Sequence, residues 1–440
     1  MQKKSILALL LAAMLILSGC SLVTVDQAAD NARVIVDVNG ETVTKQQISN
    51  AVNNTISQNE YMNQLYAMFG MTGSNPTDTA TIIPQVIDAY VENLVSLQKA
   101  KELGLDQMTE EEQAKIQEHA DEDWKTFLNQ VAQNYFPGLT LEGEALEAEA
   151  QKYIDEYKLA TKADFVDSAT KEVLLEKLEA DTVKDVVVTE EELAAGLEER
   201  VAADQETYTQ DPNAYGSAVN KGTVAYYAPA GYRMVKHILV KLEDADSTAI
   251  SDKEKAKTEA ETALTNAKTA LEEAAEDADK DALQSAVAEA EKAVQEATAA
   301  VTEATEAAFA NIQAKVDEVY AKATAEGADF DALIKEYSTD SMPEAGYAVK
   351  EGFTDFVESF VTASMGLANV GDVSEPVRSN YGVHIIKYVG DVAEGPVALD
   401  TVRASLEAEL LTAKKNTTYN DAVKAWTDAA NVKTYPEKMN

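Results

Sequence analysis

The chain has 440 residues, 45% of them hydrophobic and 26% charged, which is the composition of a globular protein with two or three domains. Its 37 Lys and Arg residues against 77 Asp and Glu residues give a net charge of -40, which repels phosphate backbones and argues against nucleic-acid binding. The acidity either keeps a long helical surface soluble or recruits cations or basic client proteins.

The first residues have the pattern of an export signal. Two lysines in MQKK precede the apolar run ILALLLAAMLIL, which is shorter than the roughly 20 residues of a membrane span. The LSGC that follows is similar to a bacterial lipobox, so we predict a lipoprotein signal peptide over 1–19, a lipidated Cys20 and a linker over 20–32. An ordinary secretory signal with an incidental cysteine is the alternative. Cys20 is the single cysteine, so no intrachain disulfide is expected.

Residues 33–224 are predicted to form a mostly helical N-terminal region. The stretch ARVIVDVNGETVTKQQIS indicates two short strands around an Asn-Gly turn and a helix that begins at Thr44. From about 46 to 205, apolar residues recur at helical spacing. Residues 206–231 are rich in Gly, Pro, Asn and Tyr and interrupt this pattern, so we place a domain boundary near 225.

An alanine-rich segment follows a strand predicted over 232–242. Residues 251–310 are one-third alanine, and no Gly or Pro occurs between Gly231 and Gly327. Spacings of three and four indicate two heptad seams, the first at Ala256, Ala260, Ala263, Ala267, Ala270 and Ala274 and the second at Leu283, Val287, Ala290, Val294, Ala297, Val301, Ala304 and Ala308. We therefore predict an antiparallel coiled-coil hairpin over 246–306. A low-complexity acidic tether without structure is the alternative.

The remainder of the chain is predicted to add a strand and a helical tail. A helix is expected to end near Gly327, and GVHIIKYV indicates the last long strand. Residues 393–440 are predicted to form one or two helices and a short strand. Their amphipathic face needs a partner, and we expect this segment to pack on the N-terminal region.

Two of the three histidines lie in predicted strands, His237 in VKHILVK and His384 in YGVHIIKYV. Together with EYSTDS, FVESFVTASMGL and VGDVSEPV between them, these motifs resemble the parvulin family of peptidyl-prolyl isomerases over residues 225–392. The resemblance implies a small antiparallel sheet with flanking helices, in which the two histidines face each other beneath the active site. The third histidine, His119, lies in an acidic helix and is expected at the surface.

The resemblance also implies which residues form the site. Its catalytic cluster is His237, Asp340, Ser379 and His384, and its proline pocket is walled by Phe356 and Phe360. Without the resemblance, a core histidine at His237 and plain helix packing at the two phenylalanines would explain these residues. Rotation about an X-Pro bond has a barrier of about 20 kcal/mol, and an apolar grip on the ring with polar groups beside the twisted amide lowers it. We expect the cluster to act structurally and electrostatically, with no metal and no cofactor.

Two stretches depart from the parvulin pattern. The family has Gly-Gly-Asp-Leu-Gly before the pocket, whereas this chain has EAGYAVKEG over 344–352, so its pocket leucine is missing or is replaced by Ala348 or Val349. This puts catalytic efficiency in question. Phosphate-directed parvulins carry a basic cluster after the first strand, where this chain has LEDADS, so recognition of phosphorylated clients is not expected.

As a whole, the chain resembles PrsA-type foldase lipoproteins and, more distantly, SurA-like chaperones. The expected fold class is α+β, with a helical chaperone region from both ends of the chain and a parvulin domain that carries the inserted arm. The resemblance implies a foldase lipid-anchored to the outer face of a Gram-positive cell membrane, with unfolded secreted proteins as partners and X-Pro isomerisation as its activity. A non-catalytic holdase with a degenerate parvulin domain is the first alternative, and a scaffold built on the acidic arm is the second.

Overall fold

The structure is a computed structural model that describes residues 26–135, 143–157, 159–274 and 279–439. The chain forms two compact units. The first comprises the described residues up to Val188 and those from Leu411 onward, and the second comprises Thr189–Leu410. The predicted signal peptide and Cys20 lie outside the described residues.

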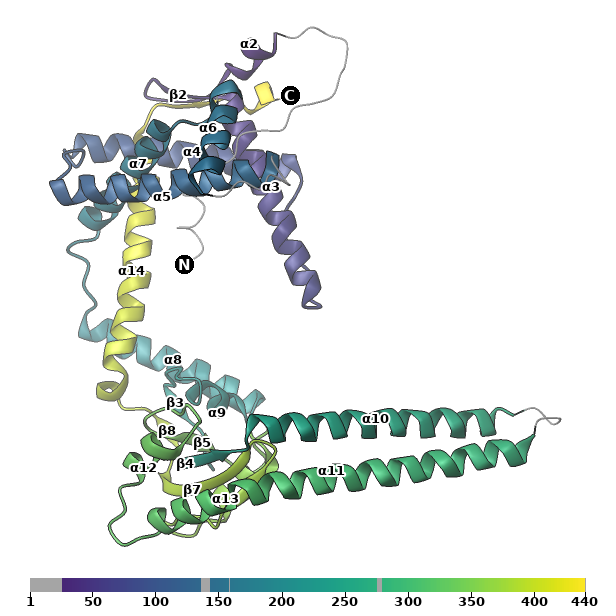
Figure 1. The fold of residues 1–440 in the computed structure, drawn as a ribbon. Helices are drawn as coiled ribbons and strands as arrows, with labels where there is room; N and C mark the ends of the chain where they lie inside the picture. Colours follow the sequence, from purple (N-terminus) through teal and green to yellow (C-terminus); the bar gives the residue numbers. More distant parts are fainter. Residues whose placement is uncertain (1–25, 136–142, 158, 275–278, 440) are drawn as a thin grey trace. The chain divides into compact units, whose positions relative to one another are not determined.

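The first unit is mostly helical, with one small antiparallel sheet (Figure 1). Its elements are α2 (Gln27–Asn31), β1 (Val34–Val38), β2 (Glu41–Thr44), α3 (Lys45–Met68), α4 (Thr79–Glu102), α5 (Glu110–Tyr135), α6 (Glu144–Tyr157), α7 (Lys162–Thr182), the later part of α14 (Leu399–Ala429), β9 (Val432–Thr434) and the short 3-10 helix η1 (Pro436–Met439).

The opening hairpin has the turn that its sequence predicts. Asn39 and Gly40 between β1 and β2 both have positive φ, 53° and 95°, as a two-residue Asn-Gly turn requires. The following helix α3 begins after Thr44, whose side chain caps it together with Gln47 in a capping box. The predicted helix start is therefore confirmed.

The C-terminal strand completes the sheet of the first unit. The strand β1 lies between β2 and β9, with Val36 opposite Thr434 and Val38 opposite Val432. Before it, Trp426 of α14 packs against a cluster that contains Leu97. The end of the chain thus packs on its beginning, as the amphipathic face of the tail requires.

The second unit contains a four-stranded antiparallel sheet, a two-stranded sheet and two long helices. Its elements are α8 (Glu190–Gln210), α9 (Ala214–Val219), β3 (Tyr227–Ala228), β4 (Arg233–Lys241), α10 (Asp244–Glu272), α11 (Lys280–Ala323), α12 (Phe330–Tyr337), β5 (Tyr347–Val349), α13 (Glu358–Gly366), β6 (Val377–Ser379), β7 (Gly382–Asp391), β8 (Gly395–Pro396) and the start of α14. The larger sheet has the order β5-β4-β7-β6.

The helices α8 and α9 belong to this second unit, which therefore begins earlier than the domain boundary predicted near residue 225. The rings of Tyr208 and Tyr215 pack edge to face at 5.6 Å, and Tyr215 packs on Tyr232 at 4.8 Å. The Asp204 carboxylate accepts backbone N–H groups of β3 and the residue before it. The domain limits stay a prediction, because a compact unit is not by itself a domain that folds alone.

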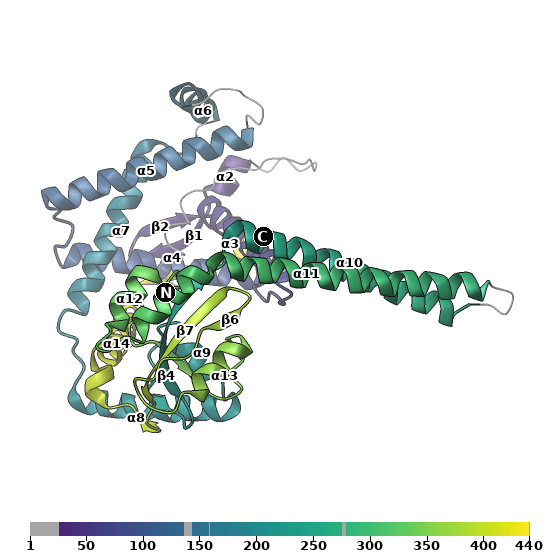
Figure 2. The same ribbon diagram turned by 60° about the horizontal axis from the view of Figure 1, so that its bottom comes forward.

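The alanine-rich segment forms a hairpin of two helices, α10 and α11, which lie along each other and run away from the sheet (Figures 1 and 2). The predicted seam on α11 is confirmed, because all eight of its residues are partly or fully buried. The seam on α10 is corrected, because Ala256, Ala263 and Ala270 are exposed. The residues that face the partner helix are Ala260, Leu264, Ala267, Leu271 and Ala274, each partly buried.

The central strands β4 and β7 bury both faces of the sheet, and their side chains alternate between two cores. On one face Ile238, Val240 and Ile385 pack against the C-terminal half of α11. On the other face Val235 and Ile386 pack in the cluster that contains Phe360 of α13. His237 and His384 lie on this second face, so the alternation directs both imidazoles toward α13.

Candidate functional site

Strand pairing brings the two histidines together. In the antiparallel register of β4 and β7, His237 lies opposite Ile386 and His384 lies opposite Leu239. The histidines are therefore diagonal neighbours on one face, a distance that long side chains bridge. Their rings stack at 5.2 Å with an angle of 21° between their planes, and their Nδ1 atoms are 3.0 Å apart.

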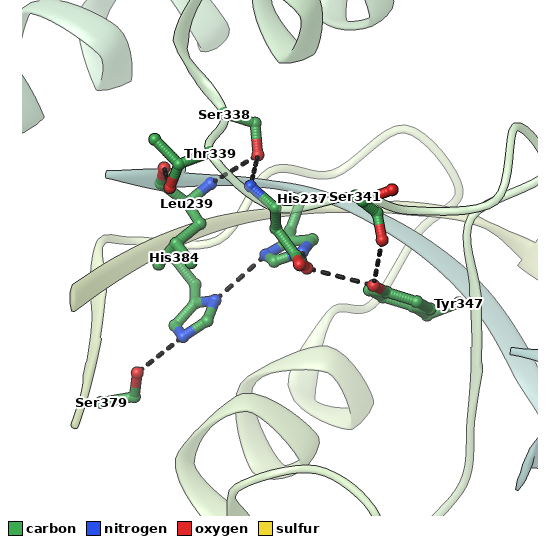
Figure 3. A network of polar contacts seen from close by, with 9 residues as sticks. His237, Leu239, Ser338, Thr339, Ser341, Tyr347, Ser379 and His384 are labelled. Carbon is green, nitrogen blue, oxygen red and sulfur yellow. Dashed lines mark hydrogen bonds and ion pairs between the residues drawn. The ribbon is translucent and has the colours of Figure 1, made fainter. Parts of the chain in front are cut away.

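The two rings form the middle of a polar chain (Figure 3). At one end the His237 Nε2 lies 2.8 Å from Oδ2 of Asp340. At the other end the His384 Nε2 lies 2.7 Å from Oγ of Ser379. The four residues of the predicted cluster are thus connected by three consecutive hydrogen bonds, although 147 residues separate the two histidines.

An ionised Asp340 fixes the direction of each hydrogen bond when the His237 ring is neutral. A carboxylate only accepts, so His237 Nε2 carries a hydrogen and the Nδ1 atom of the neutral ring accepts. His384 must then donate from Nδ1 and accept at Nε2, which takes the hydroxyl hydrogen of Ser379. Ser379 Oγ in turn accepts the backbone N–H of Tyr381. The hydrogens on His237 Nε2, His384 Nδ1 and Ser379 Oγ therefore each have an acceptor in the next residue of the polar chain.

The pKa shifts agree with a neutral His384 imidazole and an ionised Asp340 carboxylate. The hydrogen bond from His237 holds the pKa of Asp340 below its usual value, although burial opposes this. Burial lowers the pKa of His384 to about 4, and the neighbouring His237 ring acts in the same direction. His384 is consequently uncharged at neutral pH. His237 and His384 are only 3% and 5% exposed, which suits groups held in place by the fold.

Aromatic residues form the roof of this polar chain. The Phe360 ring on α13 packs edge-on against both imidazoles, at 5.1 Å from His237 and 5.2 Å from His384. Phe356 lies just before α13, outside the helix, and its ring packs on Phe360 at 5.4 Å and on Tyr347 at 4.8 Å. Phe360 therefore contacts the histidine pair directly, and Phe356, the more exposed of the two, lies beside Phe360.

The stretch that departs from the parvulin pattern forms β5. Ala348 and Val349 are completely buried there and belong to the core under α13. Both side chains are smaller than the leucine of the family pattern and pack in the cluster that contains Phe360. The surface position expected for His119 is confirmed, since its half-exposed ring faces Glu172 at 3.3 Å. Cys20 lies outside the described residues.

Sequence reasoning missed two residues that touch the polar chain. The Tyr347 hydroxyl lies 3.1 Å from Oδ2 of Asp340. The Ser338 hydroxyl accepts the backbone N–H groups of Leu239 and Asp340, and so ties the loop that carries the carboxylate to β4. Tyr347 stands inside EAGYAVKEG, and an aromatic residue at that point of a divergent stretch was the available signal.

Two family descriptions match the sequence. Residues 294–390 match a PPIC-type PPIase domain, and residues 1–134 match a SurA-like N-terminal domain. The Foldase protein PrsA of Bacillus subtilis is 37% identical over 106 residues, which are 23% of this chain and 34% of that protein. The Foldase protein PrsA of Clostridium acetobutylicum is 21% identical over 422 residues, 94% of this chain and 91% of that protein.

The chain is similar to PrsA foldases, and it spans about a third of the length of the Bacillus subtilis protein that it matches. The isomerase-domain match begins at residue 294, inside α11, and so leaves out β4 and His237. The alanine-rich hairpin separates β4 from the matched stretch in the sequence. In space β4 lies beside that stretch, because it pairs with β7. The two histidines therefore meet although the alanine-rich hairpin lies between them in the sequence.

Solved structures align along most of the chain, with low scores. The crystal structure of PrsA from Bacillus subtilis aligns over 91% of each chain with 18% identity and a TM-score of 0.21. The foldase protein PrsA from Streptococcus pneumoniae aligns over 92% of this chain and 97% of its own, with 15% identity and a TM-score of 0.20. TM-scores this low do not establish a shared fold.

The described residues contain neither a metal-ligand group nor a helix that could span a membrane. Within 26–135, 143–157, 159–274 and 279–439, no group of three His, Cys, Asp or Glu side chains is placed to hold a metal ion. In the same part of the chain, no helix has both the length and the apolar character needed to cross a bilayer.

Proposed function

We propose that this chain is a membrane-anchored, extracytoplasmic foldase that isomerises X-Pro bonds and assists the folding of secreted proteins. The observation that carries the proposal is the polar chain from Asp340 through His237 and His384 to Ser379 beneath Phe360. A parvulin-type domain match and PrsA foldases among the relatives support the same reaction class.

The geometry suits a reaction without a covalent intermediate. Isomerisation requires the amide to lose its resonance, and a site lowers this barrier when it favours the twisted form. Phe356 and Phe360 supply an apolar wall for the proline ring. The uncharged His384, held by Ser379, keeps the floor of the site polar and does not add a positive charge. The histidines act as an oriented dipolar support and not as nucleophiles.

The proposal includes a lipid anchor at Cys20 and unfolded secreted proteins as clients. The LSGC sequence supports an anchor at the outer face of the cell membrane, and foldases among the similar proteins support unfolded proteins as the client class. In the first unit, Met68, Phe69 and Met71 are exposed by 81%, 70% and 52%, and such flexible apolar side chains suit contact with varied unfolded segments.

A non-catalytic holdase is the second candidate. The observation in its favour is β5, where Ala348 and Val349 are fully buried and leave the proline pocket without the expected leucine. A holdase would bind apolar clients without accelerating the exchange of their X-Pro bonds.

The deciding experiment measures cis/trans exchange of an X-Pro peptide series by NMR with the full chain. Asp340→Asn removes the charge that orients the histidines, and Phe360→Ala removes the wall above them. We expect acceleration by the unaltered chain and a loss of about 10-fold or more in each variant. His119→Gln is the matched control, because this exposed histidine lies in the other unit and should leave the rate unchanged. Absence of acceleration by a folded, unaltered chain favours the holdase.

A further inference from the structure

We propose that Tyr347 is a positioning residue of this site, which holds the Asp340 carboxylate and thereby fixes the tautomers of the histidine pair. The proposal rests on the isomerase function argued above. It concerns a residue that lies in the stretch where the resemblance to parvulins fails. The divergent stretch would thus support the site by a contact of its own.

Strand pairing brings Tyr347 to the site. It begins β5 and lies opposite Val235 of β4, two residues before His237. Its ring is 5.6 Å from the His237 ring and 4.8 Å from the Phe356 ring, and the residue is only 8% exposed. The side chain is therefore confined between the histidine and the aromatic wall.

The glycine before it permits this close approach. Gly346 has a φ of 95°, a conformation that side chains rarely adopt. A Cβ atom built there would lie 2.3 Å from the carbonyl oxygen of Val235. A larger residue would push the start of β5 away from β4 and carry Tyr347 away from the site. The absence of a side chain at Gly346 thus allows Tyr347 to reach the site.

The hydroxyl of Tyr347 is directed at the carboxylate. It lies 3.1 Å from Oδ2 of Asp340 and 3.0 Å from the carbonyl oxygen of Ser341. A phenol has one hydrogen, and an ionised carboxylate is the stronger acceptor, so we assign this hydrogen to Asp340. Burial raises the pKa of Tyr347, and the charge of Asp340 raises it further, so the phenol remains a donor at physiological pH.

The contact matters because Asp340 is only partly enclosed. Its side chain is 35% exposed and could otherwise rotate toward water. Oδ2 receives two hydrogen bonds, from His237 Nε2 and from Tyr347, so the same oxygen is held from two directions. A carboxylate fixed in this way keeps the hydrogen on His237 Nε2, and the remaining tautomers of the polar chain follow from it.

The test uses the full chain with 15N-labelled histidine. Only three histidines are present, so ring-nitrogen spectra resolve His119, His237 and His384 individually. Tyr347→Phe keeps the ring and removes the donor. We expect the His237 ring nitrogens to move toward a mixture of tautomers and kcat/KM for an X-Pro peptide to fall about 3- to 10-fold. The exposed His119 should not change.

Tyr232→Phe is the matched control. The Tyr232 hydroxyl also lies within the core of the second unit, where it donates to the Pro212 carbonyl oxygen at 2.8 Å. It does not contact the polar chain, so its loss should leave the ring spectra of both site histidines unchanged. If both variants alter these spectra equally, Tyr347 acts only through general core stability, and the proposal is overturned.

A second pair of variants tests whether Tyr347 acts through Asp340. In an Asp340→Asn background, Tyr347→Phe should produce almost no further change in the His237 spectrum. An unchanged His237 spectrum in Tyr347→Phe alone would contradict the proposal. The failure of the isomerase function is a separate result, because it appears as absent catalysis in the unaltered chain, whereas the spectra report the tautomers with or without catalysis.

Discussion

The two halves of α11 differ in what they bury, although they are one continuous helix. Its C-terminal half packs on the sheet through Phe309, Ile312, Val316 and Val319, all nearly inaccessible to solvent. Its N-terminal half packs only on α10, a helix that buries no side chain fully within 244–272. The residues that pack between the two helices in this half are mostly alanine and valine, with isolated leucines. The same secondary structure is therefore held by a core in one half and by a thin seam in the other.

Helix length and helix propensity therefore do not determine how stable each half of α11 is. Alanine is the best helix former, and it supports both halves locally. Burial of large apolar side chains adds roughly 1.5–3 kcal/mol per residue only where a second layer covers them. The arm can therefore open locally while the half of α11 that packs on the sheet stays closed. Three predictions test this difference.

The largest effect is expected for Phe309→Ala in the core half. Phe309 is 5% exposed, and the Arg378 guanidinium lies over its ring at 4.4 Å. Its loss should lower the free energy of unfolding of the second unit by about 3–5 kcal/mol. Hydrogen exchange of the β4 and β7 amides measures this. Trp fluorescence does not, because the two tryptophans, Trp124 and Trp426, both lie in the first unit.

Leu264→Ala in the arm is the control for this variant. Leu264 is only partly buried, so we expect a loss of about 1 kcal/mol that is confined to exchange in α10 and the facing part of α11. Faster exchange in β7 of Leu264→Ala would show that the arm and the sheet unfold as one unit, and would remove the distinction between the halves.

A fall in pH should lower the stability of the four-stranded sheet and leave the stability of the α10–α11 hairpin unchanged. The pKa of His384 is about 4 in the folded chain against its usual 6.5, so between these values the unfolded chain binds more protons. The contribution of His384 to the free energy of unfolding is fully present above about pH 6.5. It is lost as the pH falls toward 4, and the total loss is on the order of 3 kcal/mol. The lowered pKa of Asp340 adds a loss at still lower pH.

Hydrogen exchange at a series of pH values, corrected for the intrinsic rate, measures this slope in β4 and β7. The arm contains no histidine and should not show it. His384→Gln should lose the part of the slope that belongs to this group, whereas His119→Gln should keep it. A slope that persists unchanged in His384→Gln would assign the acid sensitivity to other groups.

The smallest effect compares the same substitution in both halves of one helix. Val316 is 1% exposed, and Val287 is a partly exposed seam residue. Val→Ala gains about 0.5 kcal/mol of helix propensity at either position. At Val316 the lost burial and the cavity outweigh this gain by about 1–2 kcal/mol. At Val287 the two terms should nearly cancel. Equal losses at both sites, measured by exchange of the flanking amides, would contradict the comparison.

The two seams show what the sequence could and could not predict. On α11 the residues Leu283, Val287 and Val294 mark one face among alanines, and that seam was predicted correctly. On α10 alanine is so frequent that more than one register has the spacing of three and four. Leu264 and Leu271, which bury more area than Ala263 and Ala270, decide the register in the structure.

The candidate site likewise contains residues that the sequence could predict and one that it could not. The motifs around His237, His384 and Asp340 are local in sequence, so a resemblance could identify them and the structure brings them together. The contact of Tyr347 depends on the register of β5 against β4 and on the close approach at Gly346. Neither is visible from residue spacing, because both depend on a strand pairing that spans more than 100 residues.

The pairing of β9 with β1 has a consequence for the order of folding. Val36 and Thr434 pair, so the sheet of the first unit closes only when nearly the whole chain is present. The second unit is contiguous from Thr189 to Leu410, so all of its residues precede β9 in the sequence. A chain synthesised from its N-terminus would therefore contain every residue of the second unit before the last strand of the first unit is available. Closure over so long a separation is slow, and a truncation of the last ten residues would leave β1 with an open edge.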